Sequence, residues 1–126
     1  MTKTQTFRFP IPREVVLNAN QPIHHRVKGL HVKALRSMGE TLGKACFENK
    51  FTKFTVDVYV YAPSKRRIDP PNMYPTVKPL IDGMTDANIW EDDDHTHLTT
   101  MSFMYGGLSK LPDMFIIEFI VKGEVA

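Results

Sequence analysis

Apolar and polar residues alternate most regularly between positions 54 and 61. This two-residue period is typical of a β-strand with one buried face. A shorter strand is predicted at residues 4–9, and we expect the prolines of residues 10–12 to end it because proline cannot donate a hydrogen bond to a neighbouring strand. The buried face of the strand at residues 54–61 would consist of Phe54, Val56, Val58 and Val60.

Two segments show the spacing of three and four residues that is typical of a helix with one apolar face. The first runs from His31 to about Asn49, and the second covers roughly residues 76–88. Thr76 is the expected N-cap of the second helix. Pro79 would then lie near the start of that helix, where its missing N–H has no partner in any case.

Four prolines between positions 62 and 75 predict irregular structure there, and we expect the chain after residue 12 to be irregular up to about Leu30. Two further strands are predicted at residues 95–104 and 113–122. A longer loop that contains the two glycines of residues 106–107 would join them as a hairpin.

The predicted order is therefore strand, helix, strand, helix, strand, strand. We predict an α/β fold, a small single domain over residues 1–126 in which two helices pack on a mixed β-sheet. A chain of 126 residues suits one core. The single cysteine, Cys46, falls in the apolar pattern of the first helix, where we expect a buried small hydrophobe.

The chain shows no targeting or membrane signal. No apolar run approaches the roughly 18 residues of a membrane span, and the N-terminal residues lack the apolar core of a signal peptide. One cysteine cannot form an internal disulfide, which suits a reducing compartment. We therefore expect a cytoplasmic protein that has no membrane partner.

Charge is divided unequally along the chain. Residues 1–67 carry 13 Lys or Arg against four acids, a net charge of +9, whereas residues 68–126 carry three Lys against ten acids, a net charge of −7. Such asymmetry indicates either a polyanionic partner or two halves that interleave and pair their charges within one fold.

Carboxylates are concentrated on both sides of the second predicted helix. Adjacent carboxylates repel each other unless a cation or solvent compensates them, and Mg²⁺ binds one or two protein carboxylates together with water. A helix of about 12 residues is about 18 Å long, so a neighbouring segment must fold back along it to complete one site. We predict a Mg²⁺ site, with Mn²⁺ as a substitute, formed by Asp69, Asp92, Asp93 and Asp94.

Basic residues close to these acids indicate a phosphodiester substrate, because its hydrolysis also needs positive charge for the developing oxyanions. Lys78 would supply this charge, or it would only form an ordinary ion pair with Asp82 four residues later. The basic run before Asp69 would grip the DNA backbone without reading its sequence. That run consists of Lys65, Arg66 and Arg67.

The irregular segment that ends near Leu30 contains polar residues of the kind that loops offer to ligands, among them Asn20, Arg26 and Lys28. His95 and His97 would share one strand face beside the aspartates. A third hypothesis, a His-Asp metalloprotein that acts on something other than DNA, would use them as ligands together with the aspartates.

Several of these motifs together resemble the RusA-type Holliday junction resolvases, endodeoxyribonucleases often encoded by phages and prophages. The matching residues are the stretch Arg66 to Asn72 (RRIDPPN), Lys78, Asp82-Gly83-Met84, Asp86-Ala87, Trp90 and Asp92-Asp93. The resemblance implies a homodimer that binds four-way DNA junctions in recombination or repair and, with Mg²⁺, nicks two strands symmetrically. It also implies the cytoplasm of a bacterium or of a phage-infected host cell.

The resemblance also implies residue roles. Asp69, Lys78 and Asp93 match the catalytic residues of the family, Asp92 matches the neighbour of the later aspartate, and Asn72 joins the predicted DNA-binding residues. Asp82 matches the acid within the helix. Pro71, however, stands where the family has a second acid. Either Asp92, Asp94 or water replaces that acid, or the protein is a junction-binding or DNA-binding module with a degenerate catalytic site.

Overall fold

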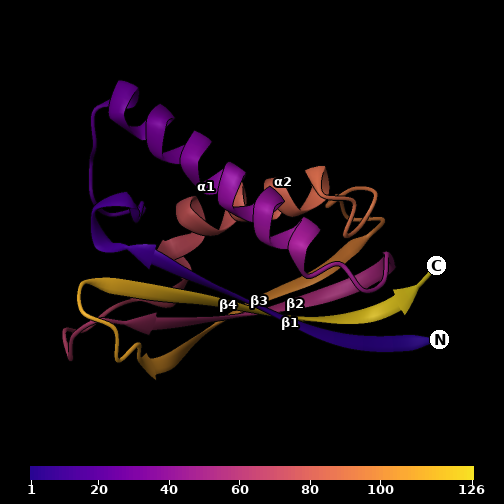
Figure 1. Cartoon of the computed structure of the whole chain (residues 1–126). Helices are drawn as coiled ribbons and strands as arrows, with labels where there is room; N and C mark the ends of the chain where they lie inside the picture. Colours follow the sequence, from indigo (N-terminus) through magenta and orange to yellow (C-terminus); the bar gives the residue numbers. More distant parts are fainter.

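A mixed four-stranded sheet forms one layer of the computed structural model, which describes residues 1–126 (Figure 1). The spatial order of the strands is β1-β4-β2-β3. Strand β4 pairs antiparallel with both β1 and β2, whereas β2 and β3 are parallel. The strands are β1 (Thr2–Pro12), β2 (Phe51–Ala62), β3 (Leu98–Leu108) and β4 (Met114–Val125).

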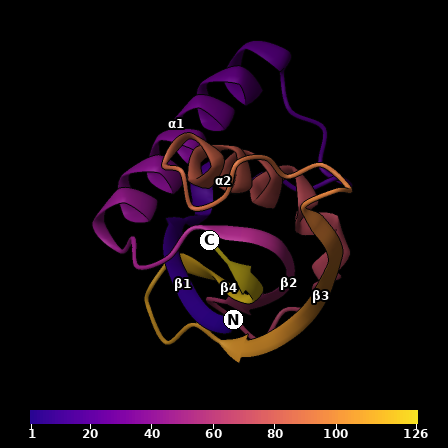
Figure 2. The ribbon, with the colours of Figure 1, turned by 90° about the vertical axis from the view of Figure 1, so that its right-hand side faces the viewer.

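Two helices, α1 (His25–Ala45) and α2 (Tyr74–Asp86), form the second layer. Both lie on the same face of the sheet (Figures 1 and 2). Short 3-10 turns precede them, η1 at Arg13–Val15 and η2 at Pro70–Met73. The predicted α/β fold, with two helices on a mixed sheet, is therefore confirmed.

One hydrophobic core fills the space between the two layers and contains 21 buried residues. Trp90 is fully buried in it, and its ring stacks on Phe54 with 4.3 Å between ring centroids. The indole nitrogen donates a 2.7 Å hydrogen bond to the hydroxyl of Thr85. The core thus anchors the segment after α2 just before the three consecutive aspartates.

The two helices cross where glycines allow their backbones to meet. A Cβ atom on Gly39 of α1 would collide with the carbonyl oxygen of Leu80, and one on Gly83 of α2 would collide with that of Arg36. A Cβ atom on Gly43, four residues after Gly39, would collide with the methyl group of Ala87. The paired glycines of α1 therefore serve close helix packing.

The predicted hairpin of the last two strands is wrong. Strand β4 lies between β1 and β2, whereas β3 forms the edge beyond β2. The reason is burial, because β4 is apolar enough for a central position, whereas β3 carries Thr99, Thr100 and Ser102 and suits an edge. Gly106 and Gly107 belong to β3, and Gly106 packs against the ring of Tyr61.

Several predicted boundaries also need correction. Strand β1 does not stop at residue 9 but continues through Pro10 and ends at Pro12, which an edge strand tolerates because half of its N–H groups face solvent. Helix α1 begins at His25 rather than at His31, and its first six residues are all exposed. It ends at Ala45, which leaves Cys46 exposed instead of buried.

The start of α2 also differs from the prediction. Prolines 70 and 71 begin η2, which leads directly into the helix at Tyr74. Thr76 is therefore not the N-cap. It is buried inside the helix, where its hydroxyl donates to the carbonyl oxygen of Leu17 at 2.6 Å and accepts from the Leu17 N–H at 2.7 Å. This pair of bonds fixes the segment that follows η1 against α2.

Candidate functional site

Lys78 is the centre of a cluster of opposite charges on α2. Its ammonium lies 2.9 Å from the carboxylate of Asp82 and 2.5 Å from that of Asp93. Asp82 is one helical turn away, whereas Asp93 comes from the segment after the helix. The ion pair with Asp82 that spacing alone predicts is therefore present, but it is only half of the arrangement.

The segment after α2 folds back along the helix and so brings Asp93 to Lys78. Trp90 holds this segment in the core, and the Phe51 N–H donates to the carbonyl oxygen of Ile89 at 2.8 Å. Beyond Trp90, the carboxylate of Asp92 accepts the Asp93 N–H at 2.7 Å. The sequence predicts that the 62–75 loop or the incoming strand folds back along the helix to join Asp69 to the three aspartates. In the structure the segment after α2 folds back, and it brings Asp93 to Lys78 without assembling those aspartates into one group.

The two carboxylates keep Lys78 charged. Partial burial of the ammonium lowers its pKa, but the hydrogen bonds to Asp93 and Asp82 outweigh this effect and raise the pKa above the ordinary value for lysine. The side chain keeps 41% of its surface exposed. A permanently cationic group that is still accessible from solvent suits contact with a phosphate.

Asp94 is bonded to the turn that leads into β3. One of its carboxylate oxygens accepts the N–H and the hydroxyl of Thr96, at 3.0 and 2.5 Å, and lies 2.8 Å from Nδ1 of His97. The hydrogen bonds from Thr96 and then from His97 lower the Asp94 pKa to about 2. Asp94 thus has a structural role in this turn, whatever else it binds.

The four aspartates predicted as magnesium ligands are not assembled into one group. No group of three or more His, Cys, Asp or Glu side chains is arranged to hold a metal ion. Asp69 meets only the side-chain amide of Asn72, at 3.5 Å. The carboxylates that converge are those of Asp82 and Asp93, and two carboxylates with water match the ligands that Mg²⁺ ordinarily takes. The magnesium site formed by Asp69, Asp92, Asp93 and Asp94 stays a prediction.

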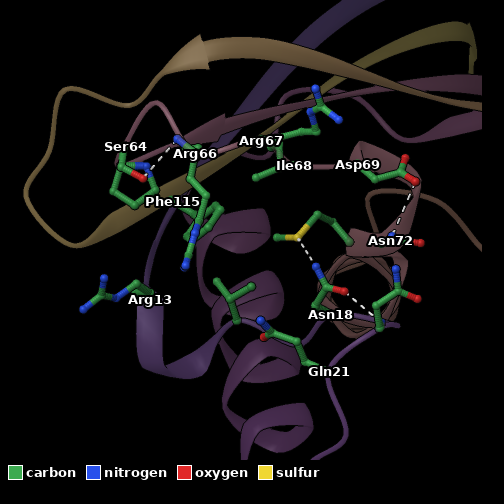
Figure 3. Close-up of a pocket in the computed structure, with 15 residues that line it drawn as sticks. Arg13, Asn18, Gln21, Ser64, Arg66, Arg67, Ile68, Asp69, Asn72 and Phe115 are labelled. Atoms are coloured by element: carbon green, nitrogen blue, oxygen red, sulfur yellow. Dashed lines mark hydrogen bonds between the residues drawn. The ribbon is translucent and has the colours of Figure 1, made fainter.

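Most of the predicted DNA-binding residues line one pocket of about 730 Å³ between the loop that follows β2 and the segment that follows η1 (Figure 3). Asp69 lies at its edge beside Asn72. Arg66 extends toward Phe115, whereas Arg67 points the opposite way (Figure 3). The predicted members of the lining are Asn20, Arg66, Arg67, Asp69 and Asn72.

The other predicted DNA-binding residues lie around this pocket. Lys28 lines a neighbouring cavity of about 220 Å³ that shares Asn18 and Gln21 with the pocket. Arg26 is exposed on the first turn of α1, and Lys65 is exposed in the loop beside Arg66. None of the five basic residues predicted to bind DNA forms an ion pair within the chain. Their charge is therefore available to a partner.

The sequence did not single out Arg13, Gln21 and Phe115, which also line the pocket. The polar segment around Asn18 gave a partial signal, because it contains several carboxamides. Arg13 and Phe115 gave none, since they meet only through the pairing of β1 with β4. The Arg13 N–H donates to the carbonyl oxygen of Asp113 at 2.9 Å at the end of that ladder.

Comparison with known proteins leaves the family open. No protein-family model matches the chain, and no curated protein matches it. Neither helix is long and apolar enough to cross a membrane. The resemblance to the RusA-type resolvases therefore rests on the motif residues alone.

Proposed function

We propose that the protein is a magnesium-dependent, structure-selective endodeoxyribonuclease of the RusA type that resolves four-way DNA junctions by paired symmetric nicks. The observation that carries the proposal is the meeting of Asp93 with Lys78 and Asp82. These three motif residues are separated by up to 15 positions and yet share one charged centre. An ordinary surface ion pair needs only two of them.

Hydrolysis adds one water molecule across a phosphodiester bond. The water oxygen bonds to phosphorus, the bond from phosphorus to one sugar oxygen breaks, and a water proton ends on that sugar oxygen. Lys78 stabilises the charge that develops on the phosphate oxygens. Asp82 and Asp93 keep its ammonium charged and in position, and they are the carboxylates that would hold Mg²⁺, which supplies Lewis acidity when it is bound.

The unpaired basic residues supply the grip on DNA. Arg66, Arg67 and Lys28 lie around one continuous concave region, and guanidinium groups bind phosphate through paired hydrogen bonds. A homodimer would present two such regions and two charged centres. Two-fold symmetry suits a junction whose arms are themselves related by a near two-fold axis.

The test is cleavage of a synthetic four-way junction in Mg²⁺ and in EDTA. We expect paired nicks that need Mg²⁺ and that Asp93→Asn slows about 100-fold or more, the usual effect of removing one group that stabilises a transition state. Asp57→Asn, on the sheet face that the helices do not cover, is the matched control and should cut normally. Nicking that persists in Asp93→Asn would exclude the proposed site.

A second candidate, a junction-binding module without catalysis, is favoured by one observation. Pro71 occupies the place of the family's second acid in an exposed turn, and the carboxylates form no group of three. Tight junction binding without any nick in Mg²⁺ or Mn²⁺ would support this module. A protein that carries stoichiometric zinc and ignores junctions would instead point to a metalloprotein built on His95 and His97.

A further inference from the structure

The pocket beside Asp69 has a composition that a simple backbone grip does not require. Its lining includes the partly buried apolar residues Val16, Ile68 and Phe115, whereas Arg13 and Arg66 of the same lining are exposed. Phosphates accept hydrogen bonds and carry charge, so arginines alone are enough to hold them. Partly buried apolar side chains in the same lining as exposed arginines indicate a flat, partly apolar group next to a phosphate.

Carboxamides form the second unusual part of the lining. Asn20, Gln21 and Asn72 each carry both a donor and an acceptor, which is the combination that the edge of a nucleobase offers in return. The side chains of Asn20 and Gln21 are exposed and make no hydrogen bond within the chain. They are therefore free to bond to a ligand.

The loop that carries these amides is held in place before any ligand binds. The side-chain oxygen of Asn18 accepts the Asn20 N–H at 2.8 Å, and the Gln21 N–H donates to the carbonyl oxygen of Asn18 at 3.1 Å. The Ala19 N–H donates to the carbonyl oxygen of Asn72 at 2.8 Å, which ties this loop to η2. A preformed pocket of about 730 Å³ is in the size range of sites for small ligands.

We propose that this pocket receives one unpaired nucleotide of a DNA strand. The base lies on the apolar part of the lining, and Gln21 and Asn20 bond to its edge. Arg66 holds one adjoining phosphate, and Arg13 binds another in exchange for its exposed ion pair of 3.5 Å with Asp113. The strand continues past Asn18 and Gln21 toward Lys28, which lines the adjacent cavity. The inference rests on the proposed function, because a junction provides unpaired or distorted nucleotides at its crossover, and it gives that site a means to prefer one base.

The experiment separates base binding from phosphate binding. The probe is a fluorescein-labelled strand of five deoxyribose phosphates that carries one base at its centre, prepared with each of the four bases, and its fully abasic counterpart. Binding is measured by fluorescence anisotropy in EDTA. For at least one base, we expect affinity about tenfold or more above that of the abasic strand, the usual effect of one stacked base.

Two variants assign the roles. Gln21→Ala should remove most of the difference between the base-bearing and abasic strands, whereas Arg13→Ala should weaken both strands by the same factor. Lys3→Ala, at the opposite end of β1 from Arg13, is the control and should change neither. Asn20→Ala repeats the first test on a second exposed side chain, and circular dichroism verifies that each variant is folded.

Equal affinity of the wild-type protein for the base-bearing and abasic strands would overturn the inference, as would full discrimination in both Gln21→Ala and Asn20→Ala. These outcomes are independent of catalysis, because no metal is present and no bond is cut. Failure of the Asp93→Asn cleavage test would leave the base discrimination standing. Conversely, a protein that nicks junctions but binds both strands equally would keep the proposed function and lose only this pocket.

Discussion

At the scale of single residues, the three consecutive aspartates have three different roles. Asp93 is the member that meets Lys78, Asp92 accepts the Asp93 N–H, and Asp94 bonds to Thr96 and His97. The mutual repulsion of the run is therefore relieved by separate partners, and no shared ion is needed for the fold itself. Adjacent residues in an irregular segment point in different directions, which explains the separation.

Asp94 gives a prediction about pH. Its pKa is lowered from 3.8 to about 2 by the bonds from Thr96 and His97, so the charged carboxylate stabilises the folded state above about pH 4. This contribution is lost as the pH falls toward 2. Asp94→Asn should therefore lower the free energy of unfolding at pH 7, and its difference from the wild type should shrink between pH 4 and pH 2 in urea titrations.

Thr96→Val serves as a companion to this measurement. It removes the hydroxyl that bonds to Asp94, so the pH-dependent part of the stability should become smaller while the carboxylate itself remains. A difference between Asp94→Asn and the wild type that stays constant down to pH 2 would show that the charge of Asp94 does not contribute.

At the scale of elements, the crossing of α1 and α2 determines where Lys78 lies relative to the sheet. Gly39 and Gly83 allow the two helix backbones to touch, and Arg36 of α1 binds Asp86 at the end of α2 through two bonds of 2.7 and 3.0 Å. The bond to Arg36 lowers the Asp86 pKa. Asp86, which belongs to the family-like motif, is thus part of the helix contact.

The glycine contact can be tested directly. Gly83→Ala should lower the free energy of unfolding by about 1 to 3 kcal/mol or more, because the added methyl group forces the helices apart. Gly29→Ala is the matched control. A Cβ atom there meets nothing within 4 Å, so the helix should become up to about 1 kcal/mol more stable. Chemical denaturation measures both, and equal effects would contradict the packing argument.

At the scale of the whole molecule, the basic and acidic halves of the chain interleave. Arg8 pairs with Glu118, Arg13 with Asp113, and Arg36 with Asp86, each across the two halves. The interleaved alternative is therefore confirmed for part of the charge. The five basic residues predicted to bind DNA have no such partners, unlike Arg13 of the same pocket. They leave one positively charged region for a polyanion, which stays a prediction.

Salt dependence measures this uncompensated charge. Arg66→Ala should weaken junction binding in EDTA for every junction sequence and lower the slope of log K against log salt concentration by about 1. Lys3→Ala, far along β1, should leave the slope unchanged. A slope that is the same in Arg66→Ala and in the wild type would remove Arg66 from the contact with DNA phosphates.

The sequence by itself was sufficient for the strands, the helices and the α/β class, because the apolar periods of two and 3.6 residues are local properties of the chain. It also located Asp69, Lys78 and Asp93 as candidates. Only the tertiary structure decided that β4 lies between β1 and β2, that Asp93 and not Asp69 meets Lys78, and that Arg13 and Phe115 border one pocket. These facts depend on which distant strands pair and on how the core anchors Trp90. A local sequence pattern does not determine which distant segments pair with each other.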